Sequence, residues 1–365
     1  MNGRPSLPAS AGLFEPLTLR SVTLRNRIVL SPMAQYSAVE GRANDWHLVH
    51  YASRATGGLG GAVVEVTAVR PEGRIGPGDL GLWDDTQVAA LARVAEGIAA
   101  QGAVPGIQIG HAGRKACTAR PWQGGGAVPL DQGGWVPLGP GEEPFGPTWP
   151  APRAMTEADL AAVVASFAAA AQRAQRAGFR ILELHAAHGY LLHQFLSPLT
   201  NRRGDGWGGT FERRARLTLE VARAVRAAWP AELPLWARIS ATDWAAGGWD
   251  VDEAVRLAGL LGAAGVDLVD SSSGGLVAHQ QVPAAPGFQV PFAERIRREA
   301  GVPTGAVGLI TGPEQADAIL RTGRADVVLL GRVLLRDPYW PLHAAHALGV
   351  EAPWPVQYLR GKPVD

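Results

Sequence analysis

The chain contains a single cysteine and carries almost no net charge. Cys117 is the single cysteine among 365 residues, which excludes an intramolecular disulfide framework and a cysteine-based zinc site. A single cysteine also fits a reducing compartment. The 34 Lys and Arg residues nearly balance the 33 Asp and Glu residues, so the formal net charge is +1. Because no electrostatic excess exists, we expect neither nucleic acid nor a membrane surface as a partner.

Long hydrophobic runs are also missing. No stretch approaches the roughly 18 uninterrupted apolar residues of a membrane-spanning helix. Residues 1–16 contain no apolar run long enough for a signal peptide. Apolar residues nevertheless make up 47% of the chain and charged residues only 18%, which is typical of a globular protein with a large core. We therefore expect a cytoplasmic globular protein.

Short apolar runs alternate with helical patterns along the sequence. The candidate strands are 28–30, 62–66, 104–109, 180–184, 235–239, 268–269, 304–307 and 327–330. The candidate helices are 46–55, 86–100, 156–177, 212–228, 251–264, 291–300 and 313–321. Such alternation predicts parallel strands joined by right-handed crossovers. About eight strand–helix units predict a (β/α)8 TIM barrel.

The chain is longer than a minimal barrel, and the surplus falls in three places. We predict one domain over residues 1–365, with the barrel over 27–345. Residues 17–24 predict a hairpin that caps the bottom of the barrel. Residues 111–155 form a long Gly- and Pro-rich loop after strand three, and loops of that length are usually functional. Residues 346–365 form a C-terminal tail.

An open doubly wound sheet is the competing fold. Such a sheet usually binds a nucleotide through a glycine fingerprint after its first strand. Here the first strand is followed by Ser31-Pro32-Met33, without that fingerprint. The barrel is therefore the preferred prediction.

The densest polar cluster follows the fourth strand. His185, His188 and Tyr190 all lie where a barrel carries its chemistry, at the carboxyl end of a strand. Imidazoles can donate hydrogen bonds to a substrate oxygen, and a phenol can give up a proton. Two other interpretations stay open. The His-x-x-His spacing could hold a metal, although catalytic zinc normally needs a third protein ligand, and the histidines could be structural.

Gln108 and Arg238 are polar residues inside otherwise apolar strands. A buried arginine must meet an anion or a fixed acceptor, because an unpaired buried charge is costly. Arg238 could contact a cofactor, or it could form a salt bridge with Glu65 or Glu183. Gln108 can donate and accept at once, which suits the edge of a heterocycle, or it could bond to barrel backbone.

The last two strands predict a phosphate site. Gly308 follows strand seven, and Gly331-Arg332 follows strand eight, where barrels often bind phosphate. Glycines there let backbone N–H groups approach an anion beside the arginine. Together with Gln108 and Arg238, this site predicts a phosphorylated heterocycle over the barrel mouth.

The sequence resembles the old yellow enzyme family of FMN-dependent ene-reductases, and specifically its thermophilic-like branch. The resemblance extends over about the whole chain. The residues that carry it are Leu24–Ile28, Ser31-Pro32-Met33, His111–Lys115, His185–Leu191, Phe195–Pro198, Asn201-Arg202-Arg203, Gly331-Arg332 and Arg336-Asp337-Pro338. The segment from His185 to Arg203 is the most specific part.

The resemblance implies a bound FMN and NADPH as hydride donor. The cofactor-binding residues that it implies are Ser31, Pro32, Met33, Ala34, Val66, Gln108, Arg238, Gly308, Gly331 and Arg332. The last three of these would bind the phosphate, and Arg238 would stabilise negative charge on the reduced flavin.

The resemblance also implies a reaction. The substrates would be α,β-unsaturated aldehydes and ketones, including enones and maleimides, and nitro compounds. His185 and His188 would hydrogen-bond the carbonyl oxygen, hydride would pass from flavin N5 to the β-carbon, and Tyr190 would protonate the α-carbon. Tyr36 would line the substrate pocket.

Two further implications concern the tail and a departure from the branch. Arg360 in the tail would reach into the site of a neighbouring subunit, so a homodimer or a dimer of dimers is expected. The branch usually has a cysteine after Ser-Pro-Met, where this chain has Ala34. A metal-dependent barrel hydrolase and a non-catalytic phosphate-binding barrel are the alternative functions.

Overall fold

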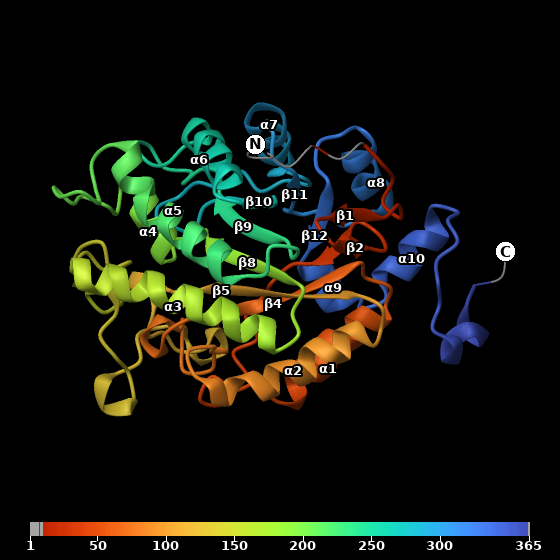
Figure 1. The fold of residues 1–365 in the computed structure, drawn as a ribbon, viewed down its shortest axis with the longest axis horizontal. Helices are drawn as coiled ribbons and strands as arrows, with labels where there is room; N and C mark the ends of the chain where they lie inside the picture. The colour runs from red at the N-terminus through yellow and green to blue at the C-terminus, as the bar shows by residue number, and fades with distance from the viewer. Residues whose placement is uncertain (1–6, 8–9, 364–365) are drawn as a thin grey trace.

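A closed barrel of parallel strands lies at the centre of the computed structural model, which describes residues 7 and 10–363 (Figure 1). Neighbouring strands follow the order β3-β4-β5-β8-β9-β10-β11-β12 and back to β3. Their bounds are Ile28–Leu30 (β3), Gly61–Ala68 (β4), Val104–Gly110 (β5), Ile181–Ala186 (β8), Leu235–Ser240 (β9), Leu268–Ser272 (β10), Thr304–Ala306 (β11) and Val327–Leu330 (β12). Each contains or overlaps a predicted run, so the predicted barrel is confirmed.

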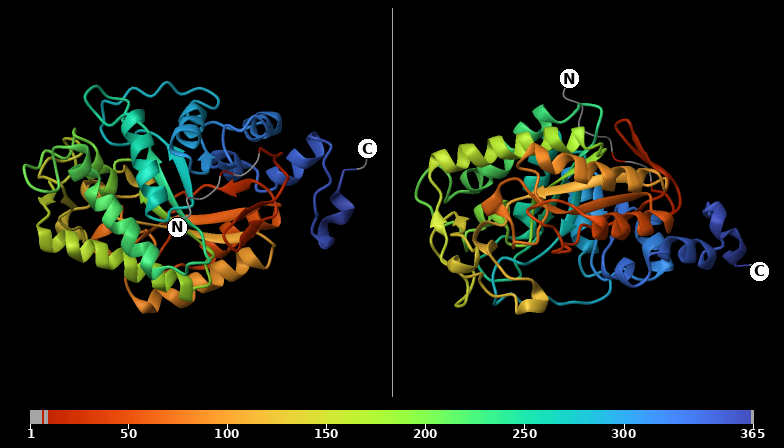
Figure 2. Two further views of the ribbon diagram at one scale, coloured as in Figure 1. Left: turned by 45° about the horizontal axis from the view of Figure 1, so that its top comes forward. Right: turned by 90° about the horizontal axis from the view of Figure 1, so that it is seen from below.

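Helices surround the barrel (Figure 2). Their bounds are Asp45–Thr56 (α1), Val88–Ala99 (α2), Glu157–Arg176 (α3), Leu191–Leu196 (α4), Phe211–Ala228 (α5), Val251–Ala263 (α6), Val290–Ala300 (α7), Pro313–Arg321 (α8), Arg332–Arg336 (α9) and Trp340–Ala347 (α10). The helix α3 begins at a capping box, in which the Thr156 and Asp159 side chains each accept from the other's backbone N–H. The short α4, α9 and α10 were not predicted, because five to eight residues show too little periodicity.

The hairpin at residues 17–24 covers the amino end of the barrel, as predicted. It consists of β1 (Leu17–Leu19) and β2 (Val22–Leu24), paired antiparallel. Arg20 in its turn forms an ion pair of 2.7 Å with Asp267, the residue before β10. Leu24 is buried near Gly61, the first residue of β4. These contacts close the bottom and leave the carboxyl ends of the strands for the site.

The long loop after β5 contains short elements of its own. They are the 3-10 helices Gly113–Lys115 (η3), Pro121–Gln123 (η4) and Leu130–Gln132 (η5) and the parallel pair Leu138–Gly139 (β6) and Arg153–Ala154 (β7). In all views this loop, coloured yellow, lies at the opposite end of the molecule from the blue C-terminal tail (Figures 1 and 2). Residues 1–6, 8, 9, 364 and 365, which belong to the predicted leading segment and tail, lie outside the described residues.

Candidate active site

The turn between β8 and α4 brings His185, His188 and Tyr190 together. The ring centroids of His185 and His188 are 5.1 Å apart, and those of His185 and Tyr190 are 4.8 Å apart, both nearly perpendicular. His188 has φ 58°, a left-handed conformation that a non-glycine residue rarely adopts. Its backbone N–H donates to Ser240 Oγ over 2.9 Å, which helps to hold this conformation. Strained residues of this kind cluster at functional sites.

Both imidazoles are neutral, and each has one ring nitrogen that is not engaged by any of the described residues. The Nδ1 atom of His185 accepts from the backbone N–H of Ala187 at 3.3 Å, so its proton is on Nε2. The Nε2 atom of His188 lies 2.7 Å from Ser272 Oγ, which leaves its Nδ1 for a ligand. Burial, together with the charge of Arg238, lowers the pKa of both histidines well below the ordinary value. Both rings are therefore uncharged at neutral pH.

Lys115 is a functional candidate that the sequence interpretation missed. Its ammonium donates to the carbonyl oxygens of His188 and Gly275, both at 2.9 Å, and lies 5.2 Å from the centroid of the Tyr190 ring. Burial lowers the pKa of Lys115 to about 8. Burial also raises the pKa of Tyr190, so the phenol keeps its proton at neutral pH. Lys115 lies in the conspicuous run His111–Lys115, but its contact with Tyr190 depends on the fold.

A small apolar cluster surrounds the Tyr190 ring. Partly buried Ala34, Tyr36, Val66 and Tyr190 pack with the buried Ile75 and its neighbours Ala112 and Ala116. Tyr36 has φ 51°, like His188 a left-handed non-glycine residue. The β4–β5 pairing shifts register between Val64 and Thr67, an irregularity next to Val66. The structure thus brings residues from three segments distant in sequence (34–36, 66–75 and 112–116) together around Tyr190, whose ring contacts His185.

Arg238 lies in the barrel interior and forms an ion pair that we did not predict. Its Nε atom is 3.0 Å from Asp270 Oδ2, and its Nη1 donates to Ser31 Oγ over 3.0 Å. The predicted alternatives, Glu65 and Glu183, were wrong as direct ion-pair partners. Glu65 faces outward to α1, where its carboxylate oxygens lie near the Tyr51 hydroxyl and accept from a backbone amide. The strand β10 extends beyond the predicted 268–269, and this extension carries Asp270.

Gln108 is bonded to a side chain rather than to barrel backbone. Its Nε2 donates to Glu183 Oε1 over 2.8 Å, which fixes the orientation of the amide. The Glu183 Oε2 atom is buried without a hydrogen-bond partner. Burial raises the pKa of both Glu183 and Asp270, while Arg238 lowers it. Below the mouth of the barrel, this interior group therefore consists of the Arg238 cation, the carboxyl groups of Asp270 and Glu183, and the Gln108 amide. The Gln108 amide can still form further hydrogen bonds.

A cavity of about 230 Å³ lies beyond the carboxyl ends of β11 and β12. It is lined by Gly308, Gly331, Arg332 and Arg336, among others. Gly308 has φ +115°, and a Cβ there would lie 2.8 Å from the side-chain Nε2 of Gln289. This left-handed φ favours glycine, and two arginines line the cavity. Arg336 was part of a quoted motif but was not predicted as a phosphate ligand.

Met33 connects the cavity to the start of the barrel. A Cβ on Gly331 would lie 3.4 Å from Met33 Sδ, so the segment Ser31–Ala34 adjoins the cavity. Pro32, Met33 and Ala34 are all partly exposed. The segment Ser31–Ala34 thus joins Arg238, which donates to Ser31, to the cavity at Gly331.

Arg360 is the predicted site residue that the fold does not bring to the mouth of its own barrel. It lies on the exposed 3-10 helix Val356–Gly361 (η6). This helix is at the end of the molecule opposite the loop after β5 (Figure 2).

Comparison with known proteins identifies the family. The NADH:flavin oxidoreductase / NADH oxidase family matches this chain over residues 12–351. The chain belongs to this family. It is the old yellow enzyme family that the motifs indicated.

The relatives agree closely in length. An NADPH dehydrogenase of Geobacillus thermodenitrificans is 48% identical over 351 residues, covering 96% of this chain and 98% of its own. An NADPH dehydrogenase of Listeria innocua is 46% identical and covers 95% and 98%. Among solved structures, morphinone reductase has a TM-score of 0.78 at 27% identity, covering 96% of this chain and 91% of its own. This old yellow enzyme family member is therefore an FMN-dependent oxidoreductase that acts on NADPH.

The residues of this chain fit FMN. The cavity at Gly308 and Gly331, which a Cβ would narrow, and the guanidinium groups beside it match a phosphate. The Gln108 amide and the Arg238 guanidinium match the polar edge of the flavin ring.

Features of other classes of protein are absent from the described residues. Within residues 7 and 10–363, no three or more His, Cys, Asp or Glu side chains are grouped so that they could hold a metal ion. Over the same residues, no helix is long and apolar enough to cross a membrane.

Proposed function

We propose that this protein is an NADPH-dependent ene-reductase, which reduces the C=C bond of α,β-unsaturated aldehydes and ketones. The observation that carries the proposal is the pair of neutral imidazoles, His185 and His188, packed beside the protonated phenol of Tyr190. The two imidazoles can bind a carbonyl oxygen, and the phenol can deliver one proton.

FMN, when bound, supplies the two-electron hydride chemistry between NADPH and the substrate. The residues proposed to hold its ring and ribityl chain are Ser31, Pro32, Met33, Ala34, Val66, Gln108 and Arg238. Gly308, Gly331 and Arg332 are proposed to hold its phosphate. Arg238 supplies a positive charge next to the ring, and its pairing with Asp270 fixes where that charge lies.

His185 and His188 are proposed to bind the substrate carbonyl. His185 donates from Nε2, because its Nδ1 accepts from the Ala187 backbone N–H. His188 is proposed to donate from Nδ1, with its Nε2 accepting from the Ser272 hydroxyl. Negative charge grows on the carbonyl oxygen as the β-carbon is reduced. Donors fixed in advance stabilise this charge without reorganisation.

Tyr190 is proposed to protonate the α-carbon. Burial keeps the phenol protonated, and the Lys115 ammonium 5.2 Å from the ring centroid favours the phenolate that proton transfer leaves behind. Tyr36 is proposed as a wall of the pocket, since it packs in the same apolar cluster as Tyr190.

Enones, maleimides and nitro compounds are the proposed substrates. A homodimer or a dimer of dimers is proposed, in which Arg360 reaches the site of a neighbouring copy. The exposed position of this residue on η6 is compatible with that role. We also propose a cytoplasmic location, which fits the single cysteine.

Anaerobic half-reactions test the proposal. NADPH should bleach the flavin absorbance, and 2-cyclohexenone should restore it. Tyr190→Phe should keep the first step and slow the second by about 10²-fold or more, as expected for loss of a general acid. Tyr36→Phe is the matched control from the same cluster, and it should change the KM more than the rate.

His185→Ala should weaken binding of a phenol such as 4-hydroxybenzaldehyde, seen as loss of its spectral perturbation of the flavin. Wild-type rates for Tyr190→Phe in the second step would contradict the assigned roles. A reduced enzyme that cyclohexenone does not reoxidise would contradict the proposed function itself.

A further inference from the structure

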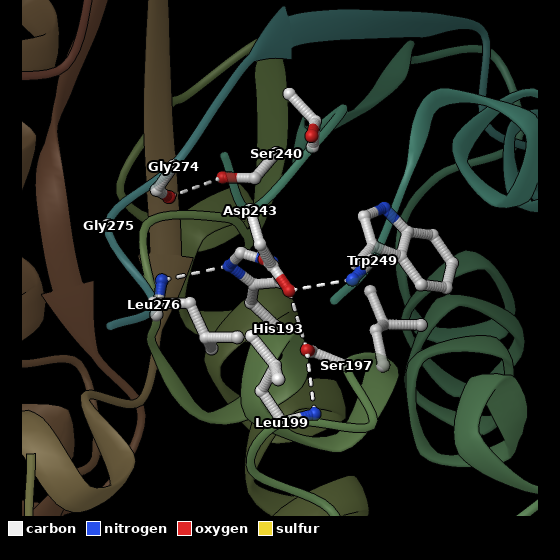
Figure 3. Close-up of polar contacts among 12 residues, drawn as sticks. His193, Ser197, Leu199, Ser240, Asp243, Trp249, Gly274, Gly275 and Leu276 are labelled. Carbon is white, nitrogen blue, oxygen red and sulfur yellow. Dashed lines mark hydrogen bonds and ion pairs between the residues drawn. The ribbon is translucent and has the colours of Figure 1, made fainter. Parts of the chain in front are cut away.

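A second buried polar cluster lies directly behind the turn that carries His188 and Tyr190. It consists of His193 on α4, Ser197 just after α4, and Asp243 in the loop after β9 (Figure 3). All three are fully buried. Neither the composition nor the motifs assigned any of them a role.

The contacts of this cluster form a chain from the Gly189 backbone through His193 to Asp243. The backbone N–H of Gly189 donates to His193 Nδ1 over 2.9 Å, and His193 Nε2 lies 2.9 Å from Asp243 Oδ1. The other carboxylate oxygen, Oδ2, accepts from Ser197 Oγ at 2.6 Å and from the backbone N–H of Trp249 at 2.7 Å (Figure 3). Since Ser197 donates to the carboxylate and not to the imidazole, this is not a nucleophilic triad.

These contacts define the tautomer of His193. A backbone N–H can only donate, so Nδ1 must be unprotonated where Gly189 meets it. A neutral ring must then carry its proton on Nε2, which lies 2.9 Å from the Asp243 carboxylate. Burial raises the pKa of Asp243, but its bonds with His193, Ser197 and Trp249 outweigh burial and hold this pKa below its ordinary value. The carboxylate thus stays ionised and selects the Nε2–H form of the ring.

Gly189 is tightly packed, so a shift of its backbone is poorly tolerated. It has φ +73°, and a Cβ there would lie 2.2 Å from the carbonyl oxygen of Gly275, so the turn fits closely against the loop after β10. Its carbonyl oxygen accepts from Gln194 Nε2 at 2.6 Å, so both sides of this residue are bonded to α4. Gly189 lies between the left-handed His188 and Tyr190. We therefore expect that losing the hydrogen bond of the Gly189 N–H would shift both His188 and Tyr190.

We propose that His193, oriented by Asp243, is a positioning residue that sets the geometry of the His188–Tyr190 turn for enone reduction. The inference rests on the proposed function for its kinetic consequence. The tautomer that it requires is independent of that function.

The first test measures the tautomer in the wild-type holoenzyme. Ring 15N shifts of histidine-labelled protein should contain one signal set of a neutral Nε2–H imidazole that His193→Gln removes. A His193 ring protonated on Nδ1, or on both nitrogens, between pH 6 and 8 would overturn the proposal. This measurement stands even if other variants fail to fold.

The second test is kinetic. Asp243→Asn replaces one acceptor by a donor, so an N–H must then face either His193 Nε2 or the Trp249 amide. Reoxidation of the reduced enzyme by 2-cyclohexenone should slow at least tenfold, and 4-hydroxybenzaldehyde should bind more weakly, because a shift of about 1 Å can cost this much or more.

Two further variants separate positioning from packing. His193→Gln keeps an acceptor for Gly189 and a donor for Asp243, so it should stay within threefold of wild type, whereas His193→Leu should lose at least tenfold. Phe195→Leu, a fully buried residue on the same helix, is the control for lost packing and should keep wild-type rates. Equal losses in His193→Gln and His193→Leu, or no loss in Asp243→Asn, would overturn the proposal. If wild type itself is not reoxidised, the proposed function fails while the tautomer result still stands.

Discussion

Removing Arg238 should destabilise the barrel in a pH-dependent way. The guanidinium and its partner Asp270 are both buried, with 6% and 0% of their side chains exposed. Arg238→Met keeps the apolar stem and removes the charge. Asp270 then remains in the interior, where neither of its carboxylate oxygens has a hydrogen-bond donor.

The cost follows from the stranded carboxylate. Breaking a buried pair on one side costs about 3–5 kcal/mol, because the remaining charge is uncompensated. Burial already raises the pKa of Asp270 and Arg238 opposes that rise, so Arg238→Met should raise this pKa further. With a folded pKa above the unfolded value of about 3.9, stability is lost as pH rises past that value, by about 1.4 kcal/mol per pH unit up to the folded pKa. The wild type already loses this stability up to the raised pKa of its own Asp270, about 6, so the deficit of the variant should be small below about pH 6 and large near pH 8.

Urea unfolding of the FMN-free protein between pH 5 and 8 measures this deficit without the contribution of cofactor binding. The double variant Arg238→Met/Asp270→Leu should recover most of the loss, since an apolar replacement of a whole buried pair is often neutral. A deficit that does not change with pH, or a double variant that loses the sum of both single variants, would refute the reasoning.

Three further predictions concern other parts of the site. Burial raises the pKa of Glu65 to about 8, so its contribution to stability is lost as pH rises from about 4.3 towards 8, and Glu65→Gln should flatten the dependence of Tm on pH across that range. Ala34→Cys should shift the flavin midpoint potential measured by spectroelectrochemistry, and an unchanged potential would contradict a role for this position. Gly308→Ala should weaken FMN binding at least tenfold by flavin fluorescence, because its Cβ would meet Gln289, whereas Gly124→Ala, also at positive φ but in open space, should not.

The fold could be predicted from local patterns because parallel barrel strands are buried on both faces and read as short apolar runs. The runs at 28–30 and 327–330 coincide with β3 and β12. Prediction was weakest where an element carries polar residues, as in β10, whose Asp-Ser-Ser end does not look like a strand. Helix α4 was missed for another reason, since six residues give no periodic signal.

Site residues could be predicted where they directly follow a strand in the sequence. The partners of these residues could not be predicted where they come from a different strand or loop. His185 and His188 could be found because the carboxyl ends of barrel strands carry chemistry. The pairing of Arg238 with Asp270 could not, because β8 with Glu183 and β10 with Asp270 both adjoin the strand of Arg238. Only the strand register places Asp270, and not Glu183, directly opposite Arg238. The approach of Lys115 to Tyr190 likewise depends on how the loop after β5 folds back.

The sequence by itself determined the barrel, the family, and the residue types at the mouth, because these depend on hydrophobic period and on residues close together in the chain. Only the tertiary structure decided which nitrogen of His185 and His193 accepts a backbone hydrogen bond, which carboxylate meets Arg238, and which side chain holds the turn at Gly189. These properties depend on directional contacts of about 3 Å between segments far apart in sequence, and no local pattern encodes such contacts.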